Sequence, residues 1–403
     1  MKILFLTDNF FPEVNAPASR TYEHAKEWIV KGEEVTVITC APNFPQGRVY
    51  DGYKNSLYSV EYIDGIKVIR VWSYITSNEG FFKRVLDYLS FAFTSFVAGL
   101  FVKTDVIVAT SPQFFTAWSG CALSFFKRKP WIFELRDLWP ESIRTVGAMK
   151  KEKVLDFLEK IELWLYKNSA KVVAVTAAFK ANLIKRGIDA DKIEIVTNGV
   201  NMELFAPVQK DDALAKKLGI EGKFVIGYIG THGMAHSLDF IVRTISKIKD
   251  DRYYFLFIGD GAMKKEVLKI AEELSVKNAT FLEPVLRSQI PLYISVTDAA
   301  LVPLKKSDTF KTVIPSKIFE NAAMQKPIFL GVDGQAREIV EAYGAGVYFE
   351  PENEQDFMEK LGVFEDKLAY ENMQKACKRL AMDYNRKKLS LDMLKIMREV
   401  RNG

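Results

Sequence analysis

Short apolar segments alternate with longer amphipathic ones along almost the whole chain, and this alternation constrains the fold more than any other feature. Continuous apolar runs are typical of strands buried in a parallel sheet, and the segments between them show helical spacing. The alternation is interrupted by a polar linker that begins at Phe205-Ala206-Pro207, and it starts again at Phe224. Two successive β/α series predict an α/β protein with two doubly wound, Rossmann-like domains that face each other.

The predicted strands define the bounds of these domains. We expect a first domain at residues 1–205, a second at residues 206–384, and a terminal helix at residues 385–403 that crosses back to the first. The strands expected in the first domain are residues 3–6, 35–39, 59–63, 67–72, 106–109, 131–135, 172–175 and 193–196. Those expected in the second are residues 224–229, 253–258, 279–282, 298–302, 327–330 and 347–349.

Composition narrows the functional class. The chain has 403 residues, 48% of them hydrophobic and 27% charged, which is typical of globular domains. A formal net charge of +5 is mild and dispersed, so it does not favour nucleic acid; it suits an anionic ligand or an anionic membrane surface. Cys40, Cys121 and Cys377 lack metal-ligand spacing, and only four apolar residues follow Lys2. We therefore expect reduced thiols, no signal peptide and a cytoplasmic location.

A basic loop joins a predicted buried strand to a helix in the second domain. Lys305, Lys306 and Lys311 lie in this loop, and the helix opens with Pro315-Ser316-Lys317. Free backbone N–H groups at a helix start favour an anion. Glu320, one turn into the helix, would repel an anion, but its carboxylate suits a pair of hydroxyls such as those of a ribose. Phosphate beside a diol indicates a nucleotide.

A glycine-rich junction follows the first strand of the second domain. Gly230 and Gly233 allow a tight approach to a ligand, and Thr231, His232 and His236 supply polar groups. The two histidines are four residues apart, so a metal pair must be considered, but no third ligand is apparent. We favour a phosphate cradle with the histidines as donors, and ordinary helix capping is the structural alternative.

In the first domain, a long loop with Pro12 and Pro17 follows the first strand and lacks the dinucleotide glycine fingerprint. The predicted strand at 131–135 delivers Arg136 and Asp137 to the carboxyl edge of the sheet, where ligands bind in open α/β folds. A salt bridge that pins the loop is the structural alternative. We favour an active-site pair because of this position.

The most apolar segment is residues 81–102, with Phe91, Phe93, Phe96 and Phe101 and with basic residues at both ends. Asp87 interrupts it, and the uninterrupted part is shorter than the roughly 20 residues that a bilayer span needs. We favour a buried helix. The alternative is a helix that rests its aromatic side in a membrane interface, with its basic flanks toward anionic headgroups.

Three segments carry a family resemblance. They are Arg136-Asp137-Leu138-Trp139-Pro140-Glu141-Ser142, Gly230-Thr231-His232-Gly233-Met234-Ala235-His236 and Pro315-Ser316-Lys317-Ile318-Phe319-Glu320. Together with the paired α/β domains, they resemble the GT-B glycosyltransferases of family four over essentially the whole chain. The subgroup they resemble makes bacterial surface polysaccharides and includes the N-acetyl-L-fucosamine transferases of O-antigen and capsule assembly.

The resemblance implies a function. The first domain would bind a polyprenyl-diphosphate-linked saccharide, and the second a UDP-sugar such as UDP-N-acetyl-L-fucosamine. Transfer would retain the anomeric configuration and need no metal ion or other cofactor. The enzyme would work on the cytoplasmic face of the inner membrane.

The resemblance also implies site residues. The expected catalytic residues are Arg136, Asp137, His232 and Lys317. Those expected to bind the nucleotide-sugar are Gly230, Thr231, Gly233, His236, Val285, Lys311, Thr312, Pro315, Ser316 and Glu320. Those expected on the acceptor side are Asn15, Ser19 and Arg20.

Two departures from the family pattern stand out. Thr312 occupies the position of the first of two glutamates, and the usual Arg and Lys after the first strand of the second domain are replaced by Thr231, His232 and His236. Lysines of the facing loop, including Lys305 and Lys317, could supply the missing positive charge. Two alternatives stay open. One is a UDP-sugar 2-epimerase, which shares this architecture; the other, suggested by these departures, is a non-catalytic membrane scaffold that keeps a nucleotide site.

Overall fold

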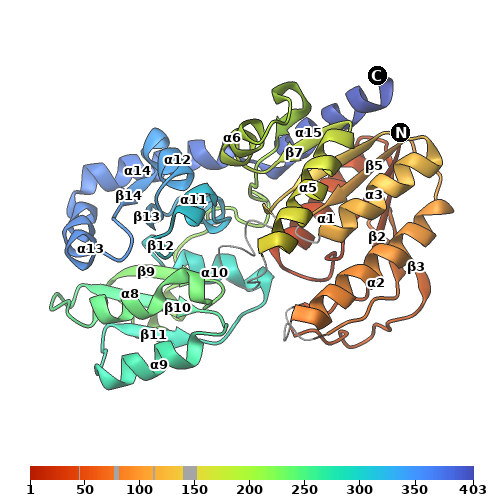
Figure 1. The fold of residues 1–403 in the computed structure, drawn as a ribbon. Coiled ribbons are helices and arrows are strands. Elements are labelled where there is room, and N and C mark those ends of the chain that lie inside the picture. The colour runs from red at the N-terminus through yellow and green to blue at the C-terminus, as the bar shows by residue number, and fades with distance from the viewer. Residues whose placement is uncertain (45, 77–80, 112–113, 139–151) are drawn as a thin grey trace. The chain divides into compact units, whose positions relative to one another are not determined.

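The computed structural model describes the chain except for residues 45, 77–80, 112–113 and 139–151. The chain forms two compact units (Figure 1). Unit 1 comprises Met1–Asn198 together with Arg386–Gly403, and unit 2 comprises Gly199–Asn385. Each unit has its own sheet and its own hydrophobic core.

The sheet of unit 1 has the strand order β3-β4-β2-β1-β5-β6-β7-β8. All neighbouring pairs are parallel except β3 and β4, which form an antiparallel hairpin. The strands are β1 (Lys2–Leu6), β2 (Glu34–Thr39), β3 (Tyr58–Ile63), β4 (Ile66–Val71), β5 (Val106–Thr110), β6 (Trp131–Leu135), β7 (Lys171–Ala174) and β8 (Ile193–Ile195). The central strands are buried on both faces, which explains their continuous apolar runs.

Helices cover both faces of this sheet. They are α1 (Ala16–Val30), α2 (Phe81–Leu100), α3 (Phe114–Lys127), α5 (Glu152–Asn168), α6 (Ala177–Lys185) and α15 (Arg386–Asn402). Leu4 and Leu6 of β1 pack on the side of α2, α3, α5 and α6, while Ile3 and Phe5 pack on the side of α1 and α15. Among the described residues, no helix is both long enough and apolar enough to cross a membrane.

The C-terminal helix α15 belongs to unit 1. The indole N–H of Trp28 in α1 donates to the carbonyl of Ser390 at 2.8 Å, and Arg386 pairs with Glu23. Met393 is fully buried against the same face of the sheet. The predicted return of the last helix to the first domain is therefore confirmed, together with the doubly wound α/β fold.

The sheet of unit 2 has the strand order β11-β10-β9-β12-β13-β14, with every neighbouring pair parallel. Its strands are β9 (Phe224–Ile229), β10 (Tyr253–Ile258), β11 (Ala279–Leu282), β12 (Ala299–Pro303), β13 (Ile328–Gly331) and β14 (Gly346–Tyr348). Its helices are α7 (Asp212–Leu218), α8 (Leu238–Ile245), α9 (Lys264–Glu273), α10 (Ile290–Ser295), α11 (Lys317–Ala323), α12 (Gln335–Tyr343), α13 (Glu354–Leu361) and α14 (Lys367–Asp383).

The strand order of unit 2 contains a topological switch point. From β9 the chain moves to β10 and β11 on one side, and β12 then pairs with the other side of β9. Loops that follow β9 and β12 therefore leave the sheet in opposite directions at adjacent carboxyl ends. In open α/β sheets this crevice is where ligands bind.

The chain enters unit 2 earlier than the polar linker suggested. Val200 forms a bridge with Asn385, and its N–H donates to the carbonyl of Tyr384 at 3.0 Å. Phe205 is 1% exposed and lies in the core of unit 2. Residues 199–205 are therefore part of unit 2, whereas the sequence-based division placed them in the first domain. The linker's polarity reflects an exposed surface rather than a boundary.

Truncating Met393, which packs α15 into the core of unit 1, tests the predicted return of this helix to the first unit. Met393→Ala should lower the free energy of unfolding of unit 1 by about 2–5 kcal/mol, because it leaves a cavity in a closed core. Urea unfolding monitored by tryptophan fluorescence measures the change. Lys395→Ala, on an exposed position of the same helix, should stay within about 0.5 kcal/mol of the parent. Equal losses for the two variants would contradict the packing.

Candidate functional site

Two loops meet at the switch point of unit 2. The first follows β9 and contains Gly230 to Ser237; the second follows β12 and leads through Lys305 into α11. The N–H of Lys305 donates to the carbonyl of Ala235 at 2.9 Å, which joins the two loops directly. The glycine-rich junction and the basic loop, identified separately in the sequence, therefore form one region of the folded protein.

A third loop, after β10, holds the first in place. The N–H of Gly230 donates to the carbonyl of Ile258, and that of His232 to the carbonyl of Asp260. A Cβ on Gly259 would lie 1.9 Å from the carbonyl oxygen of Gly230, so only glycine fits there. Sequence reasoning missed this support. Its signal is the Gly259-Asp260-Gly261 triplet directly after an apolar strand.

Lys317 presents its ammonium group to the centre of this region. Its Nζ lies 3.8 Å from the centroid of the Tyr228 ring, and a Cβ on Gly230 would lie 2.9 Å from it. The stem of the side chain is half-buried, but the nitrogen is buried and has no hydrogen-bond partner among the described residues. Burial lowers the pKa of Lys317 to about 7, and the charge of Glu320 opposes this only in part.

His232 and His236 flank the same tyrosine ring, with centroid distances of 5.6 and 6.0 Å. Within the described part of the chain, neither ring nitrogen of His232 has a partner, and Nδ1 of His236 has none. Burial and nearby lysines, Lys317 among them, lower the pKa of each histidine to about 4. Both rings are neutral at pH 7, so each can donate one N–H without repelling Lys317.

We call Tyr228, His232, His236 and Lys317 the Lys317 cluster. Buried polar groups in folded proteins are normally paired, and each one left without a partner costs about 1–3 kcal/mol. Several such groups that converge on one glycine-lined loop indicate a site built for a ligand rather than for the unliganded protein. Cationic and neutral N–H donors suit an anion.

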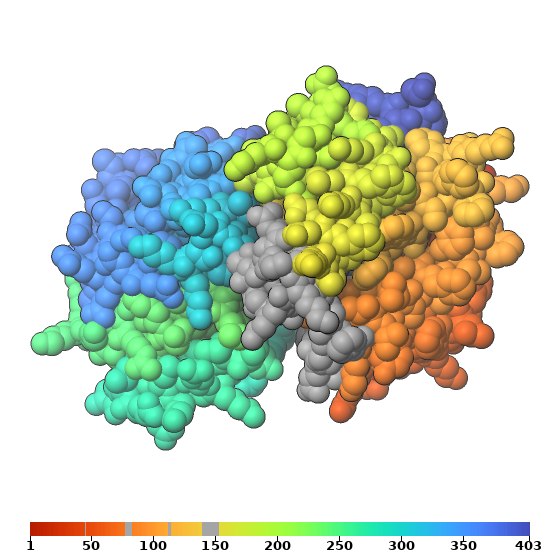
Figure 2. Space-filling model, in the orientation of Figure 1, coloured from red at the N-terminus to blue at the C-terminus, as the bar shows by residue number. Residues whose placement is uncertain are grey.

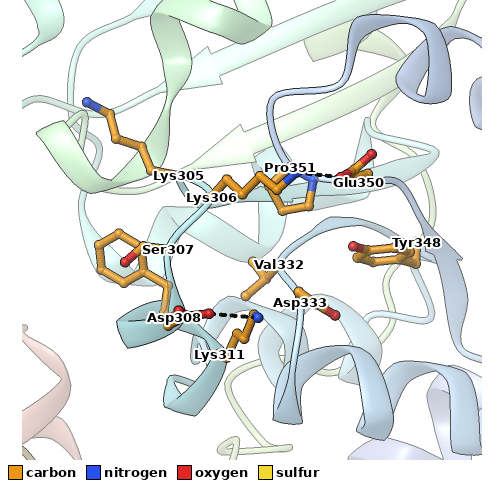
Figure 3. Close-up of a pocket in the computed structure, with 11 residues that line it drawn as sticks. Lys305, Lys306, Ser307, Asp308, Lys311, Val332, Asp333, Tyr348, Glu350 and Pro351 are labelled. Carbon is orange, nitrogen blue, oxygen red and sulfur yellow. Dashed lines mark hydrogen bonds and ion pairs between the residues drawn. The ribbon is translucent and has the colours of Figure 1, made fainter.

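The other lysines of the second loop are differently placed. A pocket of about 310 Å³ lies at the carboxyl ends of β12, β13 and β14 (Figure 3). Lys306 pairs there with Glu350 at 2.6 Å, and Lys311 pairs with Asp308 at 2.7 Å. Because Lys306 and Lys311 are already paired, the geometry favours the buried Lys317 over either of them as the cation that replaces the family's Arg and Lys.

The remaining nucleotide candidates lie on the same edge of unit 2. Glu320 is in the first turn of α11, half-buried, and its carboxylate has no partner among the described residues. The Thr312 hydroxyl donates to the carbonyl of Thr309 at 2.9 Å and so is occupied within its own turn. Pro315 and Ser316 precede α11, where Ser316 makes no side-chain cap. Val285 is half-buried after β11.

In unit 1, Arg20 is buried and fully engaged. Its Nε donates to Glu134 at 3.0 Å, and its other nitrogens donate to the carbonyls of Val196 and Thr197. The arginine is 1% exposed and ties α1 to β6 and to the end of β8. This geometry favours a structural role over the predicted contact with an acceptor.

Asn15 and Ser19 also make hydrogen bonds at the start of α1. The Asn15 side chain accepts from the N–H of Ala18 at 2.9 Å and caps the helix, and Ser19 is buried with its hydroxyl 3.4 Å from the carbonyl of Val14. Asn15 is half-buried, so an acceptor contact remains open to it.

Arg136 and Asp137 follow β6 as predicted, and both of their N–H groups donate to the hydroxyl of Ser111, at 2.7 and 3.2 Å. Nη1 of Arg136 is buried without a hydrogen-bond partner among the described residues. Burial lowers the pKa of Arg136 to about 10 despite the nearby Glu134, so it stays charged at pH 7. Trp139 to Ser142, the end of this motif, lie outside the described residues.

Solved structures share this fold over the whole chain. Sucrose-phosphate synthase from Thermosynechococcus elongatus superposes with a TM-score of 0.79 at 14% identity, covering 99% of this chain and 98% of that one. HepE of Anabaena in complex with UDP-glucose gives a TM-score of 0.73 at 17% identity, covering 99% and 100%.

Sequence families agree with the fold. Residues 18–204 match the model described as Glycosyltransferase Family 4, and residues 194–380 match Glycosyl transferases group 1. The chain is a GT-B glycosyltransferase of family four. It is 26% identical over 353 residues to WcaI of Escherichia coli K12, named as a glycosyl transferase of colanic acid biosynthesis, covering 85% of this chain and 84% of that protein.

This membership supports a glycosyltransferase over the two alternatives drawn from the sequence, an epimerase and an inactive scaffold. Within the described residues of the glycosyltransferase, no three His, Cys, Asp or Glu side chains are grouped to hold a metal ion.

Lys317→Met should stabilise the ligand-free glycosyltransferase by about 1–3 kcal/mol at pH 7. The pKa of Lys317 is near 7 in the folded protein and near 10.5 in the unfolded chain. Between these values the unfolded chain binds a proton that the folded protein does not. The parent's unfolding free energy should therefore rise with pH across this window, and the gap to the variant should close.

Urea unfolding at pH 7, 8.5 and 10 measures the gap. Lys311→Met, on an exposed and ion-paired position of the same loop, is the control and should change stability by less than about 0.5 kcal/mol. A Lys317→Met protein that is less stable than its parent at pH 7 would mean that the ammonium is a structural element.

Proposed function

We propose that this glycosyltransferase transfers a sugar from a UDP-linked donor to a hydroxyl of a polyprenyl-diphosphate-linked saccharide, in the synthesis of a bacterial surface polysaccharide such as O-antigen or capsule. The observation that carries the proposal is the Lys317 cluster at the switch point of unit 2, where buried N–H donors lack partners among the described residues. A diphosphate is an anion of suitable size and charge to take those donors.

The nucleoside would extend from the diphosphate along the same edge. In this proposal, the Glu320 carboxylate accepts hydrogen bonds from the ribose hydroxyls, and the backbone near Val285 borders the base. The choice of a uridine nucleotide is supported by HepE of Anabaena, whose structures contain UDP and UDP-glucose. Gly230 and Gly233 keep the first loop close to the phosphates, and Thr231 and Ser316 border them.

The acceptor class comes from the relatives and from the sequence. The name of WcaI refers to colanic acid biosynthesis, and that of TuaH of Bacillus subtilis to teichuronic acid biosynthesis. The three segments that resemble N-acetyl-L-fucosamine transferases suggest an N-acetylated deoxyhexosamine as the sugar. A lipid-linked acceptor implies work at the cytoplasmic face of the inner membrane.

The chemical step develops negative charge on the leaving diphosphate. Lys317 and one N–H of His232 stabilise that charge, and loss of a single donor of this kind typically lowers the rate about 10²–10³-fold. The hydroxyl of Ser111 holds the loop that carries Arg136 and Asp137. In this proposal, Asp137 orients the acceptor or the developing sugar cation rather than acting as a simple base. Transfer retains the anomeric configuration and uses no metal ion.

The ribose contact gives a sharp test. Glu320→Ala should weaken UDP binding by about 10- to 100-fold in calorimetry, because it removes a charged hydrogen-bond acceptor. The parent should prefer UDP to 2′-deoxy-UDP, and the variant should lose that preference. Glu341→Ala, on the exposed face of α12, should keep both affinities. A Glu320→Ala protein that still discriminates between the two nucleotides would place the ribose elsewhere.

Activity is tested with a panel of UDP- and GDP-sugars and a polyprenyl-diphosphate disaccharide, with the lipid product analysed by mass spectrometry. The proposal predicts a product one sugar heavier with a UDP-sugar, with UDP-N-acetyl-L-fucosamine as the first candidate. A product that forms only from GDP-sugars, or only on an acceptor without a lipid, would contradict it.

A further inference from the structure

Helix α2 carries an apolar stripe on its solvent side. Leu86, Leu89, Phe93, Val97 and Leu100 are all exposed, and their spacing of three or four residues places them on one side of the helix. The solvent side of a surface helix is normally polar. The opposite side packs in the core of unit 1 through Phe91 and Ala98. The helix is therefore apolar on both sides, which neither sequence-based interpretation described alone.

Helices α3 and α5 continue this surface. Trp118, Phe125 and Phe126 are exposed on α3. Val154, Phe157 and Trp164 are exposed on α5, again at helical spacing. Figures 1 and 2 show the three helices side by side on the face of unit 1 turned toward the viewer.

Contacts between rings make the surface continuous. The indoles of Trp118 and Trp164 stack at 6.2 Å, and Phe96 of α2 contacts Phe126 of α3 at 5.6 Å. A groove of about 340 Å³ lies at the tryptophan pair, bordered also by Lys160 and Ile161. We call the exposed apolar residues of these helices the aromatic face; they are Leu86, Leu89, Phe93, Val97, Leu100, Trp118, Phe125, Phe126, Val154, Phe157 and Trp164.

Positive charge lies at the ends of this face. Lys83 and Arg84 are exposed in the first turn of α2. Lys103 is exposed just beyond the end of α2, and Arg128 and Lys129 are exposed just beyond the end of α3. These two helix ends are adjacent, because Lys127 of α3 donates to the carbonyl of Leu100 of α2 at 2.9 Å. None of these cations forms an ion pair with a carboxylate among the described residues.

The nearest acidic groups in sequence are engaged within the unit. Asp87 accepts from the hydroxyl of Ser73 at 2.6 Å, and Asp105 accepts from the N–H of Lys2 at 2.7 Å. Arg84 also donates to the hydroxyl of Tyr88 at 3.1 Å, whereas Lys83, Lys103, Arg128 and Lys129 have no carboxylate partner among the described residues. A continuous apolar surface flanked by exposed cations is complementary to acyl chains and anionic headgroups.

We propose that the aromatic face is a docking surface for an anionic lipid bilayer; this rests on the proposed function in so far as a lipid-linked acceptor requires membrane access. Phe93, Phe125 and Phe157 enter the boundary between headgroups and acyl chains, and Trp118 and Trp164 lie at the interface, where tryptophan is enriched in membrane proteins. A second copy of the chain is the less favoured occupant. A symmetric pairing would bring the same unpaired cations together.

Vesicle flotation tests this surface with the full chain. The parent should float with vesicles of phosphatidylcholine and phosphatidylglycerol mixed 7:3, and much less with phosphatidylcholine alone. A triple variant, Phe93→Ser with Phe125→Ser and Phe157→Ser, changes one residue of each helix at positions more than 60% exposed, so the fold should survive. Its partition coefficient should fall at least about tenfold.

A matched control changes equally exposed apolar residues elsewhere. Leu57→Ser with Tyr62→Ser and Leu368→Ser should float like the parent, since these positions lie outside the three helices. Lys103→Gln with Arg128→Gln and Lys129→Gln should lower binding to the anionic vesicles by about fivefold per charge removed, and the loss should shrink in high salt.

Three results would overturn the proposal. The parent could bind neither kind of vesicle, or the triple variant could float like the parent. Alternatively, light scattering could show that the parent is a dimer and the triple variant a monomer, which would make the aromatic face a dimer interface. Calorimetry with UDP on the same samples separates this inference from the proposed function. If the parent binds vesicles but not UDP, the proposed donor site is refuted and the docking surface is supported. If it binds UDP but not vesicles, the docking surface is refuted and the donor site is supported.

Discussion

A buried ammonium with no hydrogen-bond partner among the described residues is the constraint on which the candidate site depends. Taking a charged lysine out of water costs several kcal/mol unless a partner compensates, and the cost appears here as a pKa lowered to about 7 for Lys317. The ring of Tyr228 offers only weak compensation through its face. Such a group is typical of a site whose partner is a ligand, and here the glycine-rich loop and the start of α11 bring Lys317 together with two histidines.

The surrounding fold limits the free-energy cost of burying Lys317 in two ways. The histidines beside Lys317 are neutral near pH 7, so they add N–H donors without adding like charge. Gly230 and Gly259 let two loops approach until no side chain larger than hydrogen fits between them. Both features come from the switch point between β9 and β12, where parallel strands deliver their loops to one crevice. A similar order in unit 1 brings Arg136 and Asp137 to the carboxyl edge of its sheet.

Much of the fold could be predicted because strands buried on both faces need continuous apolar runs, and β1, β5 and β9 have them. The two loops of the candidate site were also visible as glycine-rich and basic stretches after such strands. Long-range pairing was not visible. Arg20 meets Glu134 across 114 positions of sequence, and Lys306 meets Glu350 across 44, so neither charge is free for the role that its local context suggested. Helix α2 shows the same limit, since its composition indicates an apolar segment but not which apolar side chains the core covers.

The most direct test of the central claim is the pKa of Lys317, measured by NMR on protein with ¹³C-labelled lysine and assigned with the Lys317→Met variant. We expect a value near 7 in the free protein. Saturating UDP should raise it by at least about two units, since a diphosphate favours the protonated amine. A free-state value near the ordinary 10.5 that UDP leaves unchanged would contradict the account.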